Sequence, residues 1–487
     1  MTSFIEAVQN QKERTENGMK ARKSTTNACV DLFFNIGASR GKNIVPGFIS
    51  AFIEDPDKAI RILQWARDVR GGSGERQLFK DTLSYLESNH PTIAKALIAK
   101  IPELGRWDDM LIDYKNAEVR DFAYNMIKEA LLSGDRLCSK WMPRQKAISK
   151  LKGQVAINRS AKAVELQQHF GWTPKRYRKT LSTGSTTVET DMCSKKWKVI
   201  DFGKVPSLAI SRYRKAFNKN APAEFNAYVD SLTKGTATVN AGAIYPYDVI
   251  KNVNFGWSGN FELPLVESNF IAQQWNALED FVGDANVLPL VDVSGSMNTQ
   301  VGGNLNLKAL NVAISLGLYV ADKNQGKFKD TFLTFSSNPE LLHLKGDIIS
   351  KMRQMSTSKW GGSTDLHAAF TKILNTALAF DVPKSEMPKT LIIFSDMQFN
   401  QCARYDDSAI EMIRRKYTKA GYEIPNVVFW NLSASDNIPV KYTENGVALV
   451  SGFSPSVMKA VIQGDSLTPV DVMDRTIMIP RYDLEIK

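Results

Sequence analysis

Cysteine is scarce in this sequence, and its spacing excludes two kinds of small scaffold. The 487 residues contain four cysteines, Cys29, Cys138, Cys193 and Cys402, which lie far apart and form no Cys-x-x-Cys pair. This spacing argues against a zinc ribbon and against a disulfide framework, and it favours a reducing compartment. We therefore expect an intracellular, cytoplasmic protein.

Long apolar runs are absent as well. No run reaches the roughly 18 apolar residues that a membrane-spanning helix needs, so we expect no membrane association. The first 25 residues, MTSFIEAVQNQKERTENGMKARKST, lack the apolar middle of a secretory signal, and we expect residues 1–26 to form a polar, mobile arm. The composition, 43% hydrophobic and 23% charged, is that of an ordinary globular protein with about two to four domains.

The formal net charge of +11 comes from one segment of the chain. Residues 136–219 contain 20 Lys and Arg against four acidic residues, Glu165, Glu189, Asp191 and Asp201, which is an excess of 16 positive charges. The rest of the chain therefore carries a net charge of −5. Nucleic acid is the polyanion that best explains such concentrated basicity.

Residues 27–285 show mostly helical spacing of apolar side chains. The first predicted helices are NACVDLFFNIG, DPDKAIRILQWARDV, ERQLFKDTLSYLES, PTIAKALIAKIPEL and NAEVRDFAYNMIKEALL, separated by short Gly, Pro and Asn breaks. The later ones are SAKAVELQQHFGW, TPKRYRKTLS, PSLAISRYRKAF and NFIAQQWNALEDFVG. Serial helices of this length predict antiparallel pairs stacked as a HEAT-like array. Whether the array closes into a ring stays open.

The stretch VRGGSGER (residues 69–76) has the glycines of a phosphate-binding loop. It lacks the Lys-Ser/Thr ending that would contact the outer phosphates, and it follows a predicted helix instead of a strand. A plain turn between two helices is therefore the favoured interpretation.

From residue 286 to the end, at 487, predicted strands alternate with predicted helices. The strands are NVLPLVDVS, DTFLTFSS, KTLIIFSDM and NVVFWNLS, with a weaker one in VALVSGF; the helices are NLKALNVAISLGLYVADK, TDLHAAFTKILNTALAF, DSAIEMIRRKYTKAG and SPSVMKAVIQG. This alternation predicts a parallel, doubly wound, Rossmann-like sheet. The fold class is thus α + α/β, and ligands of such sheets bind at the carboxyl ends of the strands.

Oxygen-bearing side chains gather at those strand ends. Asp292, Ser294 and Ser296 follow the first strand, Thr364 starts a helix after a Gly-rich loop, and Asp396 directly follows a buried strand. Two carboxylates and three hydroxyls suit one hard octahedral cation, Mg²⁺ or Mn²⁺, with a vacancy for an acidic group of a partner. The alternative is a set of helix N-caps without a metal, because Ser and Asp favour that position.

This set of residues resembles the metal-ion-dependent adhesion site (MIDAS) of von Willebrand factor A domains. A helical array followed by such a domain resembles the Ro autoantigen (TROVE) family. The chain resembles more closely a related family known only as a domain of unknown function, in the segments STTNACVDLFF, WARDVRGGSGERQLF, IPELGRWDDML, KRYRKTLS, KKWKVIDFGKVPSLA and DVSGSM. The Ro resemblance implies a ribonucleoprotein that binds structured non-coding RNA and its single-stranded ends.

The candidate RNA-binding residues lie in the basic segment. They are Lys175, Arg176, Arg178, Lys179, Arg212, Arg214 and Lys215, with Tyr177 and Tyr213 between them. The cations would neutralise phosphates, and a tyrosine ring could stack on a base. The alternative is a solvated helix face with the tyrosines in the core.

Two other functions compete with RNA binding. A hydrolase would need a general base for Ser294 or Ser296, and His367 is the best candidate among the four histidines. The segment DVSGSM, however, does not match the GxSxG motif of a nucleophile elbow. We therefore expect a protein that is not an enzyme. The second alternative is a protein-binding scaffold whose cation captures an acidic side chain of a partner, without RNA.

Overall fold

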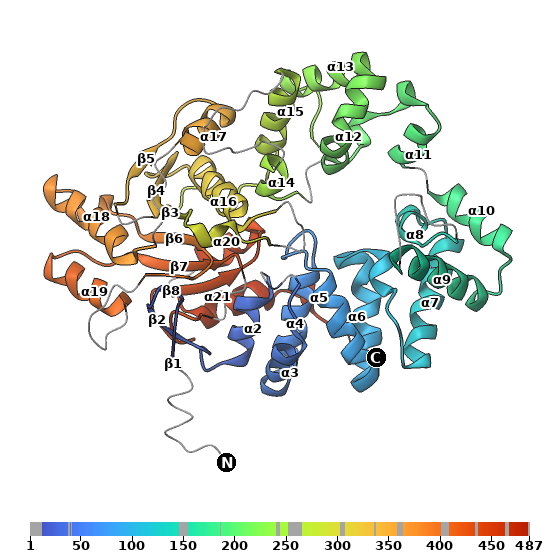
Figure 1. The fold of residues 1–487 in the computed structure, drawn as a ribbon, viewed down its shortest axis with the longest axis horizontal. Coiled ribbons are helices and arrows are strands. Elements are labelled where there is room, and N and C mark those ends of the chain that lie inside the picture. The colour runs from blue at the N-terminus through green and yellow to red at the C-terminus, as the bar shows by residue number, and fades with distance from the viewer. Residues whose placement is uncertain are drawn as a thin grey trace.

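The computed structural model describes residues 12–37, 39, 41–145, 154–185, 187–239, 244–251, 265–301, 307–335, 338–357, 364–400, 409–433, 437–462 and 467–485. A helical region is followed by an α/β domain built on one six-stranded sheet, so the predicted α + α/β class is confirmed (Figure 1). No helix within these residues has the length and apolarity that crossing a bilayer requires.

The helical region consists of short helices joined by tight turns. Its first half comprises α2 (Ala28–Ile36), α3 (Val45–Glu54), α4 (Pro56–Arg67), α5 (Gln77–Asn89), α6 (Pro91–Leu104), the 3-10 helix η1 (Trp107–Met110), α7 (Ala117–Leu132) and α8 (Arg136–Trp141). Its second half comprises α9 (Gln154–His169), α10 (Pro174–Gly184), α11 (Val188–Cys193), η2 (Trp197–Val199), η3 (Phe202–Lys204), α12 (Ser207–Asn220), α13 (Pro222–Thr233), α14 (Pro246–Ile250) and α15 (Leu265–Asn276). Consecutive helices from α3 to α7 pack as neighbours, as in a stacked array.

Local signals set where the first helices begin. The side chains of Asn27 and Asp55 cap α2 and α4 by accepting hydrogen bonds from backbone N–H groups three residues on, at 2.8 and 3.0 Å. Pro56 then suits the first turn of α4, because its fixed φ is helical and its missing N–H would have no partner there. Asp55 and Pro56 thus mark the start of α4.

Two apolar clusters hold the molecule together. The larger runs through α2 to α10 and the core of the sheet. The smaller lies in the stretch from η2 to α15 and comprises Ile200, Phe202, Val205, Ile210, Phe217, Phe225, Tyr228, Val229, Leu232 and Phe270. α15 joins the two clusters, because its Phe270 belongs to the smaller and its Trp275 to the larger. Sequence patterning had not separated these two cores.

The sheet has the strand order β5-β4-β3-β6-β7-β8. Its strands are β3 (Val287–Asp292), β4 (Thr331–Phe335), β5 (Leu341–His343), β6 (Thr390–Ser395), β7 (Asn426–Asn431) and β8 (Val447–Ser451). All pairs are parallel except β4 with β5, which is antiparallel. The parallel strands match the predicted ones. The edge strand β5 was not predicted, because its three residues alternate between exposed and half-buried and leave no apolar run.

Helices cover both faces of this sheet (Figure 1). The helices and 3-10 helices of this domain are η4 (Gly295–Asn298), α16 (Ala309–Lys323), α17 (Ile348–Thr357), α18 (Leu366–Ala379), η5 (Lys384–Glu386), α19 (Ala409–Lys419), η6 (Pro455–Val457), α20 (Met458–Ile462), α21 (Pro469–Ile477) and η7 (Pro480–Tyr482). α16 packs closest: an added Cβ on Gly317 would lie 2.3 Å from Val291 Cγ2 of β3. Glycine at this position therefore lets the helix approach the strand that carries Asp292.

The helical region begins and ends against the α/β domain. At its start, α2 packs on β8 and α21, and Ser451 Oγ donates a hydrogen bond to Phe33 O at 3.1 Å. At its end, α14 packs on α16 and α15 on α17, and Trp275 Nε1 donates to Asp322 Oδ2 at 2.8 Å. Figure 1 shows the helices running as an arc between these two attachments. The described helices and the α/β domain together follow a closed path.

The predicted mobile arm is wrong for residues 12–26. β1 (Lys12–Arg14) and β2 (Lys20–Arg22) pair as an antiparallel hairpin, and Met19 belongs to the larger apolar cluster. Arg22 also forms an isolated β-bridge with Ile438. The hairpin is ordered by backbone hydrogen bonds to the distant α/β domain, which composition cannot reveal. Residues 1–11 of the expected arm lie outside the described residues.

The end of the chain fastens the helical region to the domain. Arg481 Nη2 donates a hydrogen bond to Asp68 Oδ1 at 2.9 Å, and Tyr482 Oη donates to Asp68 Oδ2 at 3.1 Å. Burial alone would raise the pKa of Asp68, but the hydrogen bond from Arg481 and that from the backbone of Arg70 lower it below its ordinary value. Asp68 therefore stays charged inside the protein.

The VRGGSGER stretch is the turn between α4 and α5, as favoured from the sequence. An added Cβ on Gly72 would lie 1.8 Å from Trp65 O, so this residue must be glycine for packing reasons. Gly74 has φ +69°, and its Cβ would meet Tyr245 Oη at 2.7 Å. The glycines thus serve the close fit of the turn.

Candidate cation site and basic surface

The carboxyl end of β3 carries three of the predicted ligands. Asp292 is the last residue of β3, and Ser294 and Ser296 lie in the turn directly after it. The backbone N–H of Ser294 donates to Asp292 Oδ1 at 2.9 Å, and the hydroxyls of Ser294 and Ser296 are 3.0 Å apart. Asp292 and Ser294 are buried and Ser296 is half-buried. The structure brings these three side chains together.

Asp396 joins them from the next strand. It follows β6, the parallel neighbour of β3, and a hydrogen bond with the Ser296 side chain helps to hold its carboxylate. Ser395 Oγ donates to Asp292 Oδ2 at 2.6 Å. Burial, and then the charge of Asp396, raise the pKa of Asp292 to about 7. Two buried carboxylates at one place repel each other, and a cation between them would relieve that repulsion.

Thr364 lies beside the loop that follows Asp396. Its Oγ1 donates a hydrogen bond to Gln398 O at 2.7 Å, and Asn400 N donates to Thr364 O at 2.9 Å. Gln398 N in turn donates to Asp396 Oδ1 at 3.2 Å. Because the hydroxyl hydrogen of Thr364 is occupied by Gln398, its lone pairs remain available to a ligand. No contact of Thr364 with Asp292 is recorded within the described residues.

The donor set fits a hard cation with few protein charges. Oxygen ligands at neighbouring corners of an octahedron with bonds of about 2.1 Å are about 3.0 Å apart, which matches the separation of the Ser294 and Ser296 hydroxyls. Each oxygen of Asp292 accepts one hydrogen bond and keeps a lone pair, so Asp292 could meet a cation directly or through a bound water. In the described parts of the chain, no three or more His, Cys, Asp or Glu side chains gather as a metal-binding group. The described residues therefore form no zinc site of the usual His, Cys, Asp or Glu type.

Sequence reasoning did not identify two polar residues of this site. Ser395 orients Asp292, and Gln398 contacts both Thr364 and Asp396. Both residues belong to the segment LIIFSDMQF. Their roles can be assigned only when the register of β6 relative to β3 is known, because that register decides which side chains of β6 lie beside Asp292.

His367, the base required by the hydrolase alternative, lies in the first turn of α18. Its Nε2 is 3.5 Å from Thr371 Oγ1. Burial, and then the charge of Lys416, lower its pKa. This environment keeps the imidazole neutral, and its recorded partner is a threonine of its own helix.

The four cations predicted on α10 lie on its surface. Lys175, Arg176, Arg178 and Lys179 are all exposed. The guanidinium of Arg176 also stacks over the Trp172 ring, 4.8 Å from its centre. The helix therefore presents a continuous positive face to solvent.

Tyr177, expected among them as a base-stacking ring, is a core residue. Its side chain is 1% exposed, and its hydroxyl donates a hydrogen bond to Pro143 O at 3.0 Å. Burial raises its pKa. The prediction that Tyr177 stacks on RNA is therefore wrong, because the helical period turns this residue toward α8 while its four cationic neighbours face outward.

A basic hollow of about 480 Å³ lies between α10 and the junction of α7 with α8. Its lining residues are Leu131, Gly134, Arg136, Arg176, Lys179, Thr180, Thr183 and Gly184. Three of them are cations and none is acidic; no ion pair of these cations with a described residue is recorded. The acid nearest in sequence, Asp135, is engaged as the cap of α8, 2.7 Å from Cys138 N. Arg136 was not singled out from the sequence, since its place beside α10 depends on helix packing.

The cations predicted on α12 are less uniformly available. Arg212 and Lys215 are exposed, whereas Arg214 pairs with Glu267 at 3.3 Å with both side chains mostly covered. Tyr213 is half-buried, and its hydroxyl donates to Glu189 Oε1 at 3.3 Å. α12 belongs to the smaller apolar cluster and α10 to the larger, so the candidates on these two helices rest on different cores.

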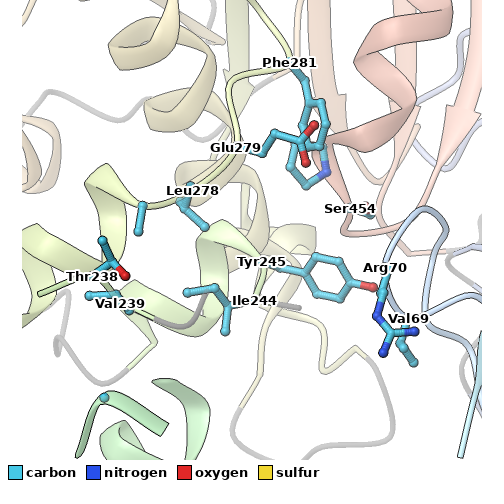
Figure 2. Close-up of a pocket in the computed structure, with 13 residues that line it drawn as sticks. Val69, Arg70, Thr238, Val239, Ile244, Tyr245, Leu278, Glu279, Phe281 and Ser454 are labelled. Atoms are coloured by element: carbon cyan, nitrogen blue, oxygen red, sulfur yellow. The ribbon is translucent and has the colours of Figure 1, made fainter. Parts of the chain in front are cut away.

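A larger cavity, about 540 Å³, lies where the helical region, the smaller cluster and the α/β domain meet. Figure 2 shows Tyr245 extending across it toward Arg70. The full lining is Val69, Arg70, Gly203, Thr238, Val239, Ile244, Tyr245, Ala277, Leu278, Glu279, Phe281, Ser454 and Pro455. One arginine and one glutamate balance in charge, so this cavity attracts a polyanion less than the basic hollow does.

Two family models match the chain. A domain of unknown function, DUF2828, matches residues 15–109 and 136–287, and another domain of unknown function, DUF7788, matches residues 286–476. The two matches meet at the border between the helical region and the α/β domain.

Two individual proteins are similar to it. Uncharacterized protein L728 of Acanthamoeba polyphaga mimivirus is 31% identical over 513 aligned residues, covering 94% of this chain and 86% of that protein. Among solved structures, the Ro (RSR) protein of Deinococcus radiodurans matches with a TM-score of 0.40 at 13% identity, covering 89% of this chain and 90% of that one.

Proposed function

From the premise that this chain belongs to the DUF2828 family, we propose that it is an RNA-binding protein that forms a ribonucleoprotein. Its basic helical surface around α10 holds the RNA. Its C-terminal domain holds one divalent cation. It acts by binding and not as an enzyme.

The basic hollow is the observation that carries this proposal. Arg136 lies on α8 and Arg176 and Lys179 on α10. Although Arg136 and Arg176 are 40 residues apart in the chain, the three cations line one hollow that has no acidic residue in its lining. Keeping several cations together without counter-charges costs free energy, which an incoming phosphate chain would repay. Lys175 and Arg178 extend the same positive face along α10.

The contacts available on this surface favour the backbone of RNA over its bases. With Tyr177 in the core, the α10 surface offers guanidinium and ammonium groups and the hydroxyls of Thr180 and Thr183. Such groups neutralise phosphates and read shape, and they carry little sequence information. We therefore propose weak sequence preference, as suits non-coding RNA with structured parts and single-stranded ends.

The cation is proposed at the ends of β3 and β6. Ser294, Ser296 and Thr364 would offer hydroxyl oxygens, and Asp292 and Asp396 would neutralise the charge, directly or through water. The repulsion between two buried carboxylates supports a cation here, Mg²⁺ or Mn²⁺. When bound, such an ion has an open position for a carboxylate or phosphate oxygen.

Recovery of RNA with the purified protein tests the main proposal. The full chain is purified at low salt with and without nuclease treatment, and the nucleic acid that remains is sequenced. RNA that is retained by the wild type and lost from a variant with Arg136, Arg176 and Lys179 changed to alanine would support it. Purification without any RNA at low salt, together with no binding of added RNA, would refute it.

A second candidate function, a scaffold that binds protein through its cation, has the buried Asp292–Asp396 pair in its favour. This function and RNA binding predict opposite responses to a chelator and to salt. Binding of an acidic partner should be abolished by a chelator or by Asp292→Ala, whereas RNA binding should weaken steeply with salt and resist the chelator.

A further inference from the structure

The hairpin of β1 and β2 is seated on the loop that follows Asp396. Thr15 Oγ1 donates a buried hydrogen bond to Phe399 O at 2.6 Å. Gly18 forms an antiparallel bridge with Asn400. A segment from the start of the chain thus lies beside the candidate cation site, some 380 residues away in sequence.

Gln398 joins the turn of this hairpin to the cation site. Its side-chain Oε1 accepts a hydrogen bond from Glu16 N at 2.8 Å, and its backbone O accepts from Asn17 Nδ2 at 2.7 Å. The same backbone O accepts from Thr364 Oγ1 at 2.7 Å, and Gln398 N donates to Asp396 Oδ1 at 3.2 Å. A displacement of the turn would therefore change the hydrogen bonds that hold two of the candidate ligands.

The side chain of Glu16 brings a third negative charge to this place. Glu16 is exposed, and no ion pair of it with a described residue is recorded. Gln398, which holds its backbone N–H, lies two residues after Asp396, so Glu16 places its charge on the same side of the domain as that carboxylate.

We propose that this hairpin turn is the acidic partner of the cation site: Glu16, held through its backbone by Gln398, adds negative charge beside the cation, so that cation binding and hairpin docking stabilise each other. This inference rests on the cation part of the proposed function. Because Glu16, Asp292 and Asp396 do not form a metal-binding cluster in the described residues, Glu16 acts through a bridging water or through its field, not as a direct ligand.

Calorimetric titration of the full chain with Mg²⁺ alone tests the electrostatic half of this coupling. Glu16→Gln should weaken Mg²⁺ binding by about fivefold, the effect in water of one unit charge about 8 Å from a divalent ion. Glu13→Gln is the matched control, because Glu13 lies on the same hairpin in β1, opposite Ala21. It should bind like the wild type. Both variants change exposed or half-buried side chains by one atom, so both should fold.

Amide hydrogen exchange tests the mechanical half. Mg²⁺ should slow exchange in residues 12–22 of the wild type and of Glu13→Gln, and have a smaller effect in Glu16→Gln. Two results would overturn the inference and still support the cation site. One is equal Mg²⁺ affinity in Glu13→Gln and Glu16→Gln. The other is that Mg²⁺ leaves the exchange rates of the hairpin unchanged although Asp292→Ala abolishes Mg²⁺ binding. A wild type that binds no Mg²⁺ would overturn both.

Discussion

Removing the three cations of the basic hollow should change how RNA binding depends on salt. Each phosphate that a protein neutralises contributes about 0.7 to the slope of log K against log salt for single-stranded nucleic acid. If Arg136, Arg176 and Lys179 each meet one phosphate, the variant with all three changed to alanine should have a slope less steep by about 2. Between 50 and 200 mM salt, the wild type should then lose about 20-fold more affinity than the variant.

Fluorescence anisotropy with a labelled single-stranded RNA over this salt range measures the slope. The matched control changes three exposed lysines of the α/β domain, Lys329, Lys384 and Lys389, to alanine, which removes the same charge far from α10 in the sequence. All six side chains are exposed, so melting temperatures should stay close to that of the wild type. An unchanged slope in the first variant, or an equal change in the control, would show that net charge alone drives binding and that the hollow has no special role.

Three further predictions concern single residues. Tyr177→Phe, which loses the hydrogen bond to Pro143, should lower the free energy of unfolding by about 0.5–1.5 kcal/mol in chemical denaturation. It should leave RNA affinity unchanged, and a drop in affinity would contradict the core assignment. Because the pKa of Asp68 is lower in the folded protein than in the unfolded chain, where it is about 3.9, its carboxylate stabilises the fold at pH values above about 3.9. This stabilisation is lost as the pH falls through the pKa of Asp68 in the folded protein. The melting temperature of the wild type should thus fall more steeply with acid than that of Asp68→Asn, and parallel curves would argue against it. Mg²⁺ at 100 times its dissociation constant should stabilise the wild type by about 2.7 kcal/mol and Asp292→Ala hardly at all, and an equal shift in both would place the ion elsewhere.

The fold could be predicted from the sequence where periodicity is strong. The strands of the sheet are short apolar runs bounded by polar turns, and the Asp55-Pro56 pair marks the start of α4. The edge strand β5 and the smaller apolar cluster could not be predicted, because their residues gain burial only from partners that lie far away in the chain. The hairpin of residues 12–22 has a polar sequence and is ordered by hydrogen bonds to a loop far away in the chain, so it could not be predicted either.

The candidate sites divide along the same line. Asp292, Ser294, Ser296 and Asp396 follow buried strands, and the parallel pairing of β3 with β6 makes their approach predictable. For Thr364, the sequence predicts only that it lies near the ends of these strands, because its exact position depends on the loop to which it is hydrogen-bonded. On the basic surface, charge could be counted but burial could not. The structure therefore separates Tyr177 from the cations beside it and adds Arg136 to them.

The packing of α2 against β8 has a consequence for how the protein is made. Phe33 O accepts a hydrogen bond from Ser451, so α2 meets this neighbour only after 418 further residues have been synthesised. Contacts between such distant segments slow folding, because the intervening chain must be ordered first. Nascent chains would meanwhile keep apolar side chains of α2 uncovered, where chaperones could bind them and neighbouring chains could aggregate. Truncation of the last strands should accordingly cost the solubility of the first helices as well.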